Sequence, residues 1–197
     1  MDHRLYLLRH GQTEWSANGR HTGHTDIPLT DVGEDQARAA GALLRDLRDG
    51  PALVLSSPRR RALHTAELAG LHVDETTESL SEWDYGDYEG VTTGKIRETV
   101  PGWTVWSYPV PGGESRDEVA ARADKALERA RDALQTTDVI LVGHGHFSRV
   151  LATRWIQLDV SAGAHFGIDP ASISVLGHEH GEPQIQHLNI TPAWVAS

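Results

Sequence analysis

The order of apolar segments along the chain constrains its fold more than any other feature. Short runs rich in leucine and β-branched residues alternate with longer runs whose apolar residues recur at helical spacing. This alternation predicts βα units and therefore a mainly parallel sheet flanked by helices. Because no repeat or linker-like segment divides the 197 residues, we expect one three-layer α/β domain over residues 1–197.

The individual elements follow from periodicity and from helix-capping signals. Strands are expected at residues 4–8, 52–55, 72–76, 138–142, 173–176 and 184–188, the last two forming a hairpin around residues 178–183. Helices are expected at residues 31–47, 61–69, 114–134 and 147–157. Thr30 or Asp31 caps the first helix, and Asp31 and Glu34 stand at capping-box spacing.

Residues 83–113 have little periodicity and are rich in glycine, proline and aromatic residues. A long irregular segment inside a compact domain is usually either functional or disordered. The aromatic content favours a lid that packs on the domain. We expect the tryptophans to pack in the interior, while Tyr85 suits packing and contact with a substrate equally well.

Composition excludes several classes of function. The net charge of −10 argues against nucleic acid or an anionic membrane as the main partner. No apolar run approaches the ~20 residues of a membrane span, and the N-terminus lacks the pattern of a secretory signal. With no cysteine there is no disulfide and no thiolate metal site, so a cytoplasmic protein is expected. The oligomeric state stays open, a homodimer being one option.

Chemically active residues follow four of the predicted strands. They lie in the segments Arg9-His10-Gly11, Ser57–Arg61, Ser81-Glu82 and Gly143-His144-Gly145. In open α/β sheets, ligands bind beyond the carboxyl ends of the strands. The segments together bring arginines, two histidines and a carboxylate to one edge, which is what phosphoryl transfer needs: cations, a nucleophile and a proton donor.

His10 can act as a nucleophile only as a neutral imidazole with one nitrogen free and the other held as a donor. A backbone carbonyl in the turn after the first strand is expected to fix that tautomer. Gly11 is expected to let the backbone approach a phosphate closely, because it carries no side chain. The sequence therefore predicts a covalent intermediate on His10.

Five separated motifs carry a resemblance to a known family. They begin with Leu-Arg-His-Gly-Gln-Thr-Glu-Trp at residues 8–15, followed by Thr22-Gly23 and Pro28-Leu29-Thr30, and continue at residues 57–66, 80–86, 111–115 and 142–145. In this order and spacing the chain resembles the histidine phosphatase superfamily, which includes the cofactor-dependent phosphoglycerate mutases. The resemblance covers essentially the whole chain and implies the phosphoglycerate mutase-like fold.

The resemblance also implies roles for five residues. His10 would carry the phosphoryl group, Arg9 and Arg61 would bind that group, and His144 would donate hydrogen bonds to its oxygens. Glu82 would protonate the leaving alkoxide and then activate water. A carboxyl group donates a proton near neutral pH only where its surroundings favour the protonated form. A buried position beside Trp83 and an anionic substrate would meet that condition.

Further residues are implied as ligands of the substrate; they are Gly11, Ser16, Thr22, Gly23, Tyr85, Gly145 and His146. Ser16 departs from many relatives, which carry asparagine there; its hydroxyl still donates one hydrogen bond, with a shorter reach. We expect the Gly23 amide to contact the phosphoryl group. His146 either faces the substrate, which we favour, or caps the following helix.

Three functions remain in competition. A mutase needs cations for a second phosphate, yet residues 83–112 contain only Lys95 and Arg97, which favours transfer to water. The run from Glu82 to Gly90 is similar to members with sugar-bisphosphatase, such as sedoheptulose-bisphosphatase, or broad acid-phosphatase activity. The expected activity is therefore hydrolysis of a small phosphate ester, without metal or cofactor. The alternatives are a cofactor-dependent phosphoglycerate mutase and a non-catalytic phospholigand-binding module.

Overall fold

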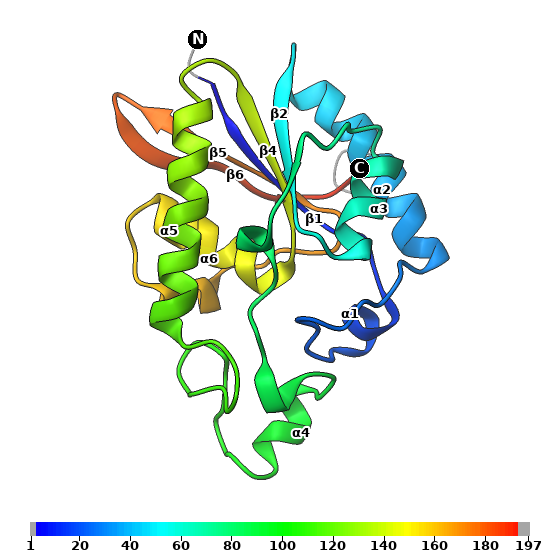
Figure 1. Cartoon of the computed structure of the whole chain (residues 1–197), viewed down its shortest axis with the longest axis vertical. Coiled ribbons are helices and arrows are strands. Elements are labelled where there is room, and N and C mark those ends of the chain that lie inside the picture. The colour runs from blue at the N-terminus through cyan, green and yellow to red at the C-terminus, as the bar shows by residue number, and fades with distance from the viewer. Residues whose placement is uncertain (1–2, 193–197) are drawn as a thin grey trace.

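One six-stranded sheet runs through the computed structural model, which describes residues 3–192 (Figure 1). The strands are β1 (Leu5–Arg9), β2 (Ala52–Ser56), β3 (Glu75–Thr76), β4 (Asp138–Gly143), β5 (Ile173–Glu179) and β6 (Glu182–Ile190). Their order is β3-β2-β4-β1-β5-β6. β3, β2, β4 and β1 pair in parallel, while β5 pairs antiparallel to β1 and to β6. The predicted α/β architecture is confirmed.

Helices cover both faces of this sheet, because β1 is apolar on both faces. Leu5 and Leu7 pack with α5 (Arg116–Ala133) and α6 (Gly145–Trp155), whereas Tyr6 and Leu8 pack with α2 (Asp31–Leu47) and α3 (Arg60–Leu68). Figure 1 shows α5 and α6 on one side of the sheet and α2 and α3 on the other. A strand buried on both faces is typical of a parallel sheet between two helical layers.

Local capping at the start of α2 decides between the two predicted caps. Thr30 is the N-cap, and its hydroxyl accepts a hydrogen bond from the Gly33 amide. Asp31 is the first helical residue, so the predicted capping box with Glu34 does not form. The two carboxylates instead lie in the first turn, where they complement the helix dipole.

The edge strands also differ in length from the prediction. β3 has two residues instead of five, because the Asp74 carboxylate accepts the Val54 amide hydrogen and takes the place of a ladder bond. The hairpin is longer than predicted. β5 and β6 continue to a turn at His180 and Gly181, whose φ values of 53° and 88° are typical of a tight hairpin turn.

The segment 83–113 packs against the domain, as its aromatic content predicts. Trp83, Trp103 and Trp106 are buried, and so is Tyr85. Short elements interrupt the segment, namely the 3₁₀ turn at Gly86–Tyr88 and α4 (Thr93–Arg97). Neither was predicted, nor were α1 (Glu14–Asn18) and the 3₁₀ turns at Glu78–Leu80 and Val160–His165.

The strand register places the predicted chemical groups at one edge. Arg9 pairs with Gly143 across β1 and β4, and Ser56 pairs with Val142 across β2 and β4. The residues that follow these strands therefore lie side by side beyond the carboxyl ends of the sheet. Within residues 3–192, no helix has both the length and the apolar character that crossing a membrane requires.

Candidate active site

The two histidines that follow β1 and β4 form the centre of the site. The ring centroids of His10 and His144 lie 5.3 Å apart, with the planes inclined by 66°. Only 4% of His10 and none of His144 is exposed. The first requirement of the sequence prediction, two imidazoles side by side at the sheet edge, is met.

His10 has the tautomer that a nucleophile needs. Its Nδ1 lies 2.7 Å from the Gly11 carbonyl oxygen, which can only accept, so Nδ1 carries the proton and Nε2 keeps its lone pair. Burial lowers the pKa of His10 well below 6.5, and the charges of Arg61 and Arg9 lower it further; the Gly11 hydrogen bond opposes them. Neutral His10 is therefore the form present near neutral pH.

His144 is held in the complementary tautomer. The Arg61 Nε–H group donates to His144 Nδ1 over 3.2 Å, so the ring proton is on Nε2, which donates to the Ser57 hydroxyl oxygen over 2.8 Å. Burial, followed by the charge of Arg61, lowers the pKa of His144 well below its usual value. An N–H donor is thus kept beside His10 without a positive charge.

Arg61 is completely buried and holds the loop at residues 22–25. Its Nη1 donates to the Thr25 carbonyl, and its Nη2 donates to the carbonyls of Thr22 and Gly23, each over 2.8–3.0 Å. With Nε bound to His144, one of its five N–H groups has no acceptor among residues 3–192. The charge of Arg61 lies at the site, but most of its donors have a structural task.

The Gly23 amide is engaged by a carboxylate, and not left free for a phosphoryl group as predicted. It donates to both carboxylate oxygens of Glu89, over 2.8 and 3.1 Å, and Thr25 also donates its amide hydrogen to Glu89. Glu89 thereby fixes the loop whose carbonyl groups hold Arg61. Thr22 lies in the same loop and donates its hydroxyl hydrogen to the Arg20 carbonyl.

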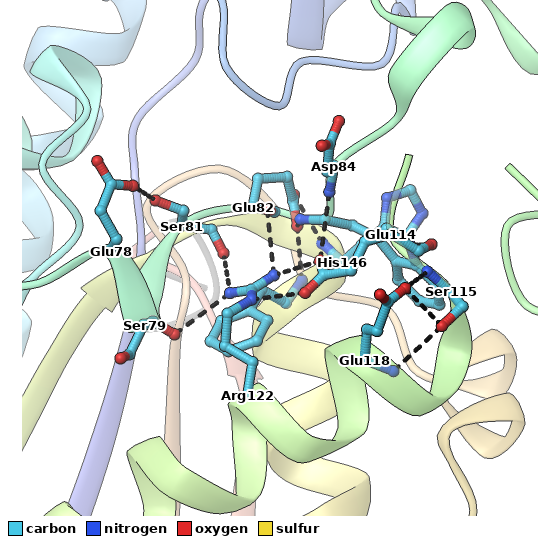
Figure 2. A network of polar contacts seen from close by, with 12 residues as sticks. Glu78, Ser79, Ser81, Glu82, Asp84, Glu114, Ser115, Glu118, Arg122 and His146 are labelled. Atoms are coloured by element: carbon cyan, nitrogen blue, oxygen red, sulfur yellow. Dashed lines mark hydrogen bonds and ion pairs between the residues drawn. The ribbon is translucent and has the colours of Figure 1, made fainter. Parts of the chain in front are cut away.

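Glu82 approaches the first turn of α6 (Figure 2). One carboxylate oxygen accepts from the amides of Trp83 and Phe147, over 2.9 and 2.7 Å, and the other accepts from the His146 amide over 3.0 Å. The residue is 7% exposed, which agrees with the predicted burial. Three amide donors fix where both oxygens point.

The backbone of Glu82 is held by a partly buried arginine. Arg122 donates to the carbonyls of Ser79, Ser81 and Glu82, as Figure 2 shows. Its Nε–H group and the second N–H group of Nη2 form charged hydrogen bonds of 2.8 and 2.7 Å with the Glu114 carboxylate. A planar fork with five donors suits this combination of acceptors, which a lysine cannot satisfy.

Arg9 and Gly145 meet at the start of α6. A Cβ atom on Gly145 would lie 3.1 Å from the guanidinium carbon of Arg9, so glycine allows this close approach. Arg9 donates from Nη1 to the Ile168 carbonyl, while its buried Nε has no partner among residues 3–192. An unpaired buried donor on a cation is suited to an anion.

Gly11 is required for a reason other than the one predicted. A Cβ atom at this position would lie 2.2 Å from the Gly33 carbonyl oxygen, so glycine allows the loop to pack against the start of α2. The Gly11 amide donates to the Thr65 hydroxyl. The predicted close approach is therefore to another part of the backbone.

Ser16 serves the local structure of α1. Its hydroxyl donates to the Thr13 carbonyl and accepts from the Thr13 amide, while the Thr13 hydroxyl accepts from the Ser16 amide. This is a capping box. In this structure the one hydroxyl hydrogen of Ser16 is thus donated within α1, and not to a phosphate site.

Tyr85 and His146 form a buried polar pair beside Glu82. The Tyr85 hydroxyl lies 2.5 Å from His146 Nδ1. Burial raises the pKa of Tyr85 well above 10 and lowers the pKa of His146 well below 6.5, so the hydroxyl donates to a neutral ring. His144 is the N-cap of α6, so the alternative that His146 caps this helix is wrong.

Comparison with known proteins agrees with this arrangement. The model of the histidine phosphatase superfamily (branch 1) matches residues 5–191. The chain belongs to the histidine phosphatase superfamily. It is similar to an acid phosphatase of Mycobacterium tuberculosis, with 52% identity over 96% of this chain and 94% of that protein.

Two further relatives support the family and the fold. A sedoheptulose 1,7-bisphosphatase of Saccharomyces cerevisiae is 31% identical over 80% of this chain and 69% of its own. The solved structure of the protein from open reading frame Rv3214 of Mycobacterium tuberculosis has a TM-score of 0.96 at 51% identity, covering 98% of this chain and 100% of that one. This histidine phosphatase is accordingly a phosphatase enzyme with the phosphoglycerate mutase-like fold.

Several residues of this histidine phosphatase were not assigned a role from the sequence. Ser57 was noted at the sheet edge, but its bond to His144 was not foreseen. Glu89 and Arg122 act on backbone groups 64–66 and 40–43 residues away, respectively. Neither residue stands out in the sequence, because Arg122 is one of many charged residues of α5 and Glu89 lies in an irregular segment with other acidic residues.

The buried histidines make the stability of this phosphatase sensitive to acid. Burial lowers the pKa of His21 from 6.5 to about 4, against the opposing charge of Glu89. Between these values the unfolded chain binds a proton that the folded chain does not, so stability falls as the pH falls. We expect His21 alone to lower the free energy of unfolding by about 3 kcal/mol between pH 7 and pH 4.5, at about 1.4 kcal/mol per pKa unit.

Chemical denaturation at both pH values measures this loss. The variant His21→Gln is expected to show a smaller loss than the wild type, although His10, His144 and His146 contribute in the same direction. His187→Gln, at an exposed position, is the control and should leave the loss unchanged. An equal loss in His21→Gln and wild type would contradict the assignment.

Proposed function

We propose that this phosphatase hydrolyses a small phosphorylated metabolite through a phosphohistidine on His10, without a metal ion. A sugar phosphate or bisphosphate is the proposed class of substrate, and the cytoplasm the proposed location. The observation that carries the proposal is the hydrogen bond from His10 Nδ1 to the Gly11 carbonyl. It leaves Nε2 as an unprotonated nucleophile beside two arginines and a neutral N–H donor.

In the first step His10 Nε2 attacks phosphorus and the bond to the ester oxygen breaks. Arg9, the remaining donor of Arg61 and His144 Nε2 stabilise the charge on the transferring oxygens. The leaving oxygen takes a proton from the Glu82 carboxyl group, which acts as the general acid. The products of this step are the free alcohol and a phosphoryl group on His10.

In the second step the roles of Glu82 reverse. Its carboxylate accepts a proton from water, and the water oxygen forms a bond to phosphorus as the nitrogen–phosphorus bond breaks. Inorganic phosphate leaves, and His10 and Glu82 return to their starting states. The positive charge that both steps require is supplied by Arg9 and Arg61, which is why we propose chemistry without a metal ion.

Transfer to water, and not return to a sugar or glycerate, is proposed from the relatives. Within residues 83–112 both cations are engaged, because Lys95 forms an ion pair with Glu98 and Arg97 donates from Nε to the Trp103 carbonyl, whereas Arg149 lies outside this segment, on α6. The relatives named as an acid phosphatase and as a sedoheptulose 1,7-bisphosphatase support a small phosphate ester. The mutase alternative has weaker support, although a probable phosphoglycerate mutase of Salmonella is 32% identical.

Phosphate release in a chelator tests this proposal. We expect the purified enzyme to release inorganic phosphate from p-nitrophenyl phosphate and from a panel of sugar phosphates at the same rate with and without EDTA. Loss of activity in EDTA that a divalent ion restores would refute metal independence.

The same assay separates the phosphatase from the mutase. With 3-phosphoglycerate and added 2,3-bisphosphoglycerate, the enzyme should release phosphate without forming 2-phosphoglycerate. Formation of 2-phosphoglycerate faster than phosphate release would establish the mutase. Binding of phosphate esters without turnover would favour the non-catalytic module.

A further inference from the structure

Arg149 lies on α6, next to the proposed site, and has no role in the steps above. It follows Gly145 by one helical turn and His146 by three residues, so the three residues share one side of the helix. Its guanidinium carbon lies 6.0 Å from the centroid of the Trp106 ring, and the His146 ring lies 5.3 Å from the same ring. Arg149 therefore faces the aromatic segment that adjoins Glu82.

One donor of Arg149 lacks an acceptor in the described part of the chain. Its Nε is buried and has no hydrogen-bond partner within the described residues 3–192. Four other arginines with partly buried side chains pair with carboxylates: Arg48 with Asp138, Arg59 with Glu78, Arg122 with Glu114 and Arg154 with Asp124. The Nε atoms of Arg48 and Arg59 are also unpaired, but the charge of each side chain is matched by its carboxylate. No such ion pair forms at Arg149 in that part of the chain. A buried cationic donor without an acceptor costs stability unless a ligand supplies the acceptor.

Arg9 also has a buried Nε without a partner among residues 3–192. The two arginines lie close enough for the charge of one to act on the other. The charge of Arg149 lowers the pKa of Arg9, although burial is the larger cause. Burial likewise lowers the pKa of Arg149, while Glu82, Tyr85 and Asp169 raise it. The Asp169 carboxylate is engaged by the Asn189 side chain over 2.9 Å. Two cations with unpaired Nε atoms thus converge on the surroundings of Glu82.

The two arginines are placed for two different anions. Arg9 contacts the start of α6 at Gly145, beside His10, where the transferring phosphoryl group is proposed to bind. Arg149 lies one turn further along α6, a rise of about 5.4 Å. Between them, Glu82 accepts hydrogen bonds from the amides of His146 and Phe147. Because Glu82 protonates the leaving oxygen, Arg149 lies on the side of the leaving group.

We propose that Arg149 binds a second anionic group of the substrate, carried by the leaving group. The inference rests on the proposed function and narrows its substrate class to bisphosphates and phosphorylated carboxylic acids. A carboxylate or a phosphate accepts a pair of hydrogen bonds from a guanidinium group, and such charged pairs are stronger than neutral ones. His146 Nε2, protonated because Nδ1 accepts from Tyr85, adds a neutral donor on the same side of α6.

Matched pairs of substrates test this inference. The first pair is 3-phosphoglycerate and glycerol 3-phosphate, in which a hydroxymethyl group replaces the carboxylate; the second is fructose 1,6-bisphosphate and fructose 1-phosphate. We expect the wild type to prefer the doubly anionic member by about 10- to 100-fold in kcat/KM, and Arg149→Gln to reduce this preference to about one. The pair with the larger ratio identifies the anion as a carboxylate or a phosphate.

The control is Arg131→Gln, because Arg131 also lies over a tryptophan ring, 5.1 Å from the centroid of Trp155 on α6. It should leave both ratios unchanged. Equal kcat/KM values within both pairs in the wild type would overturn the inference, as would an equal loss on both members in Arg149→Gln. If Arg149→Gln does not fold, Arg149→Lys takes its place. Equal wild-type kcat/KM values within both pairs, or an equal loss on both members in Arg149→Lys, would then overturn the inference. Failure to hydrolyse even p-nitrophenyl phosphate would instead refute the proposed function.

Discussion

Replacing His10 by alanine is expected to lower kcat for p-nitrophenyl phosphate by at least about 10⁴-fold, because the nucleophile is lost. A water molecule in place of the imidazole is a much poorer nucleophile, because the imidazole is oriented by Gly11 and kept neutral by burial. Arg9, Arg61 and His144 remain in the variant and continue to bind the phosphoryl group. We therefore expect KM to change much less than kcat.

Steady-state release of p-nitrophenol measures the effect, and rapid quenching of the wild type should show phosphate on the peptide that contains His10. The phosphate should be labile in acid and stable in alkali, as expected of a phosphorylated imidazole. His187→Ala, at an exposed position on β6, is the control for loss of a histidine. Turnover of folded His10→Ala at the wild-type rate would refute the covalent mechanism.

Glu82→Gln is expected to lower kcat for alkyl phosphates by about 10²- to 10⁴-fold, the usual contribution of a general acid. The effect on p-nitrophenyl phosphate should be smaller in the first step, since p-nitrophenolate leaves without a proton. Hydrolysis of the phosphohistidine still lacks its base, so the phosphorylated enzyme should accumulate. A burst of p-nitrophenol followed by slow turnover is the expected time course.

The dependence on the leaving group separates the chemical role of Glu82 from its structural one. A glutamine amide nitrogen cannot accept the His146 amide hydrogen, so the variant also disturbs the start of α6. Such a disturbance alone would slow all substrates alike. Glu118→Gln changes an exposed carboxylate of the network in Figure 2 and should leave kcat unchanged. A loss in the rate of phosphohistidine formation in Glu82→Gln, measured in the pre-steady-state phase, that does not depend on the leaving group would contradict its role as the acid.

The sequence predicted the layers of the fold because its apolar patterns are long enough to be read. β1 is apolar on both faces, and α2 and α5 extend over four turns or more, so their periodicity is clear. The elements that were missed, α1 and α4, have five residues each and no buried face long enough for a pattern. The length of β3 was wrong because a single side chain, Asp74, replaces a backbone bond.

The residues of the candidate site were predictable from the sequence, but the hydrogen bonds that connect them were not. The motifs after β1, β2 and β4 place His10, Arg61 and His144 at one edge, and the structure brings these side chains together. The bond from Gly23 to Glu89 joins residues 66 positions apart, and spacing along the chain gives no sign of it. The cations of residues 83–112 do not include Arg149, which lies on α6, on the side proposed for the leaving group.

The separation between strand ends and the 83–113 segment has a consequence for how enzymes of this kind diversify. All the groups proposed for chemistry except Glu82 lie at or after the ends of β1, β2 and β4, whose register fixes them. Two groups next to the proposed leaving group, Tyr85 and Trp106, come from the irregular segment. A third, Arg149, lies one turn after the start of α6. Mutations in the second set can alter which ester is accepted while the reaction stays the same. Substrate range can thus drift under selection without passing through an inactive enzyme.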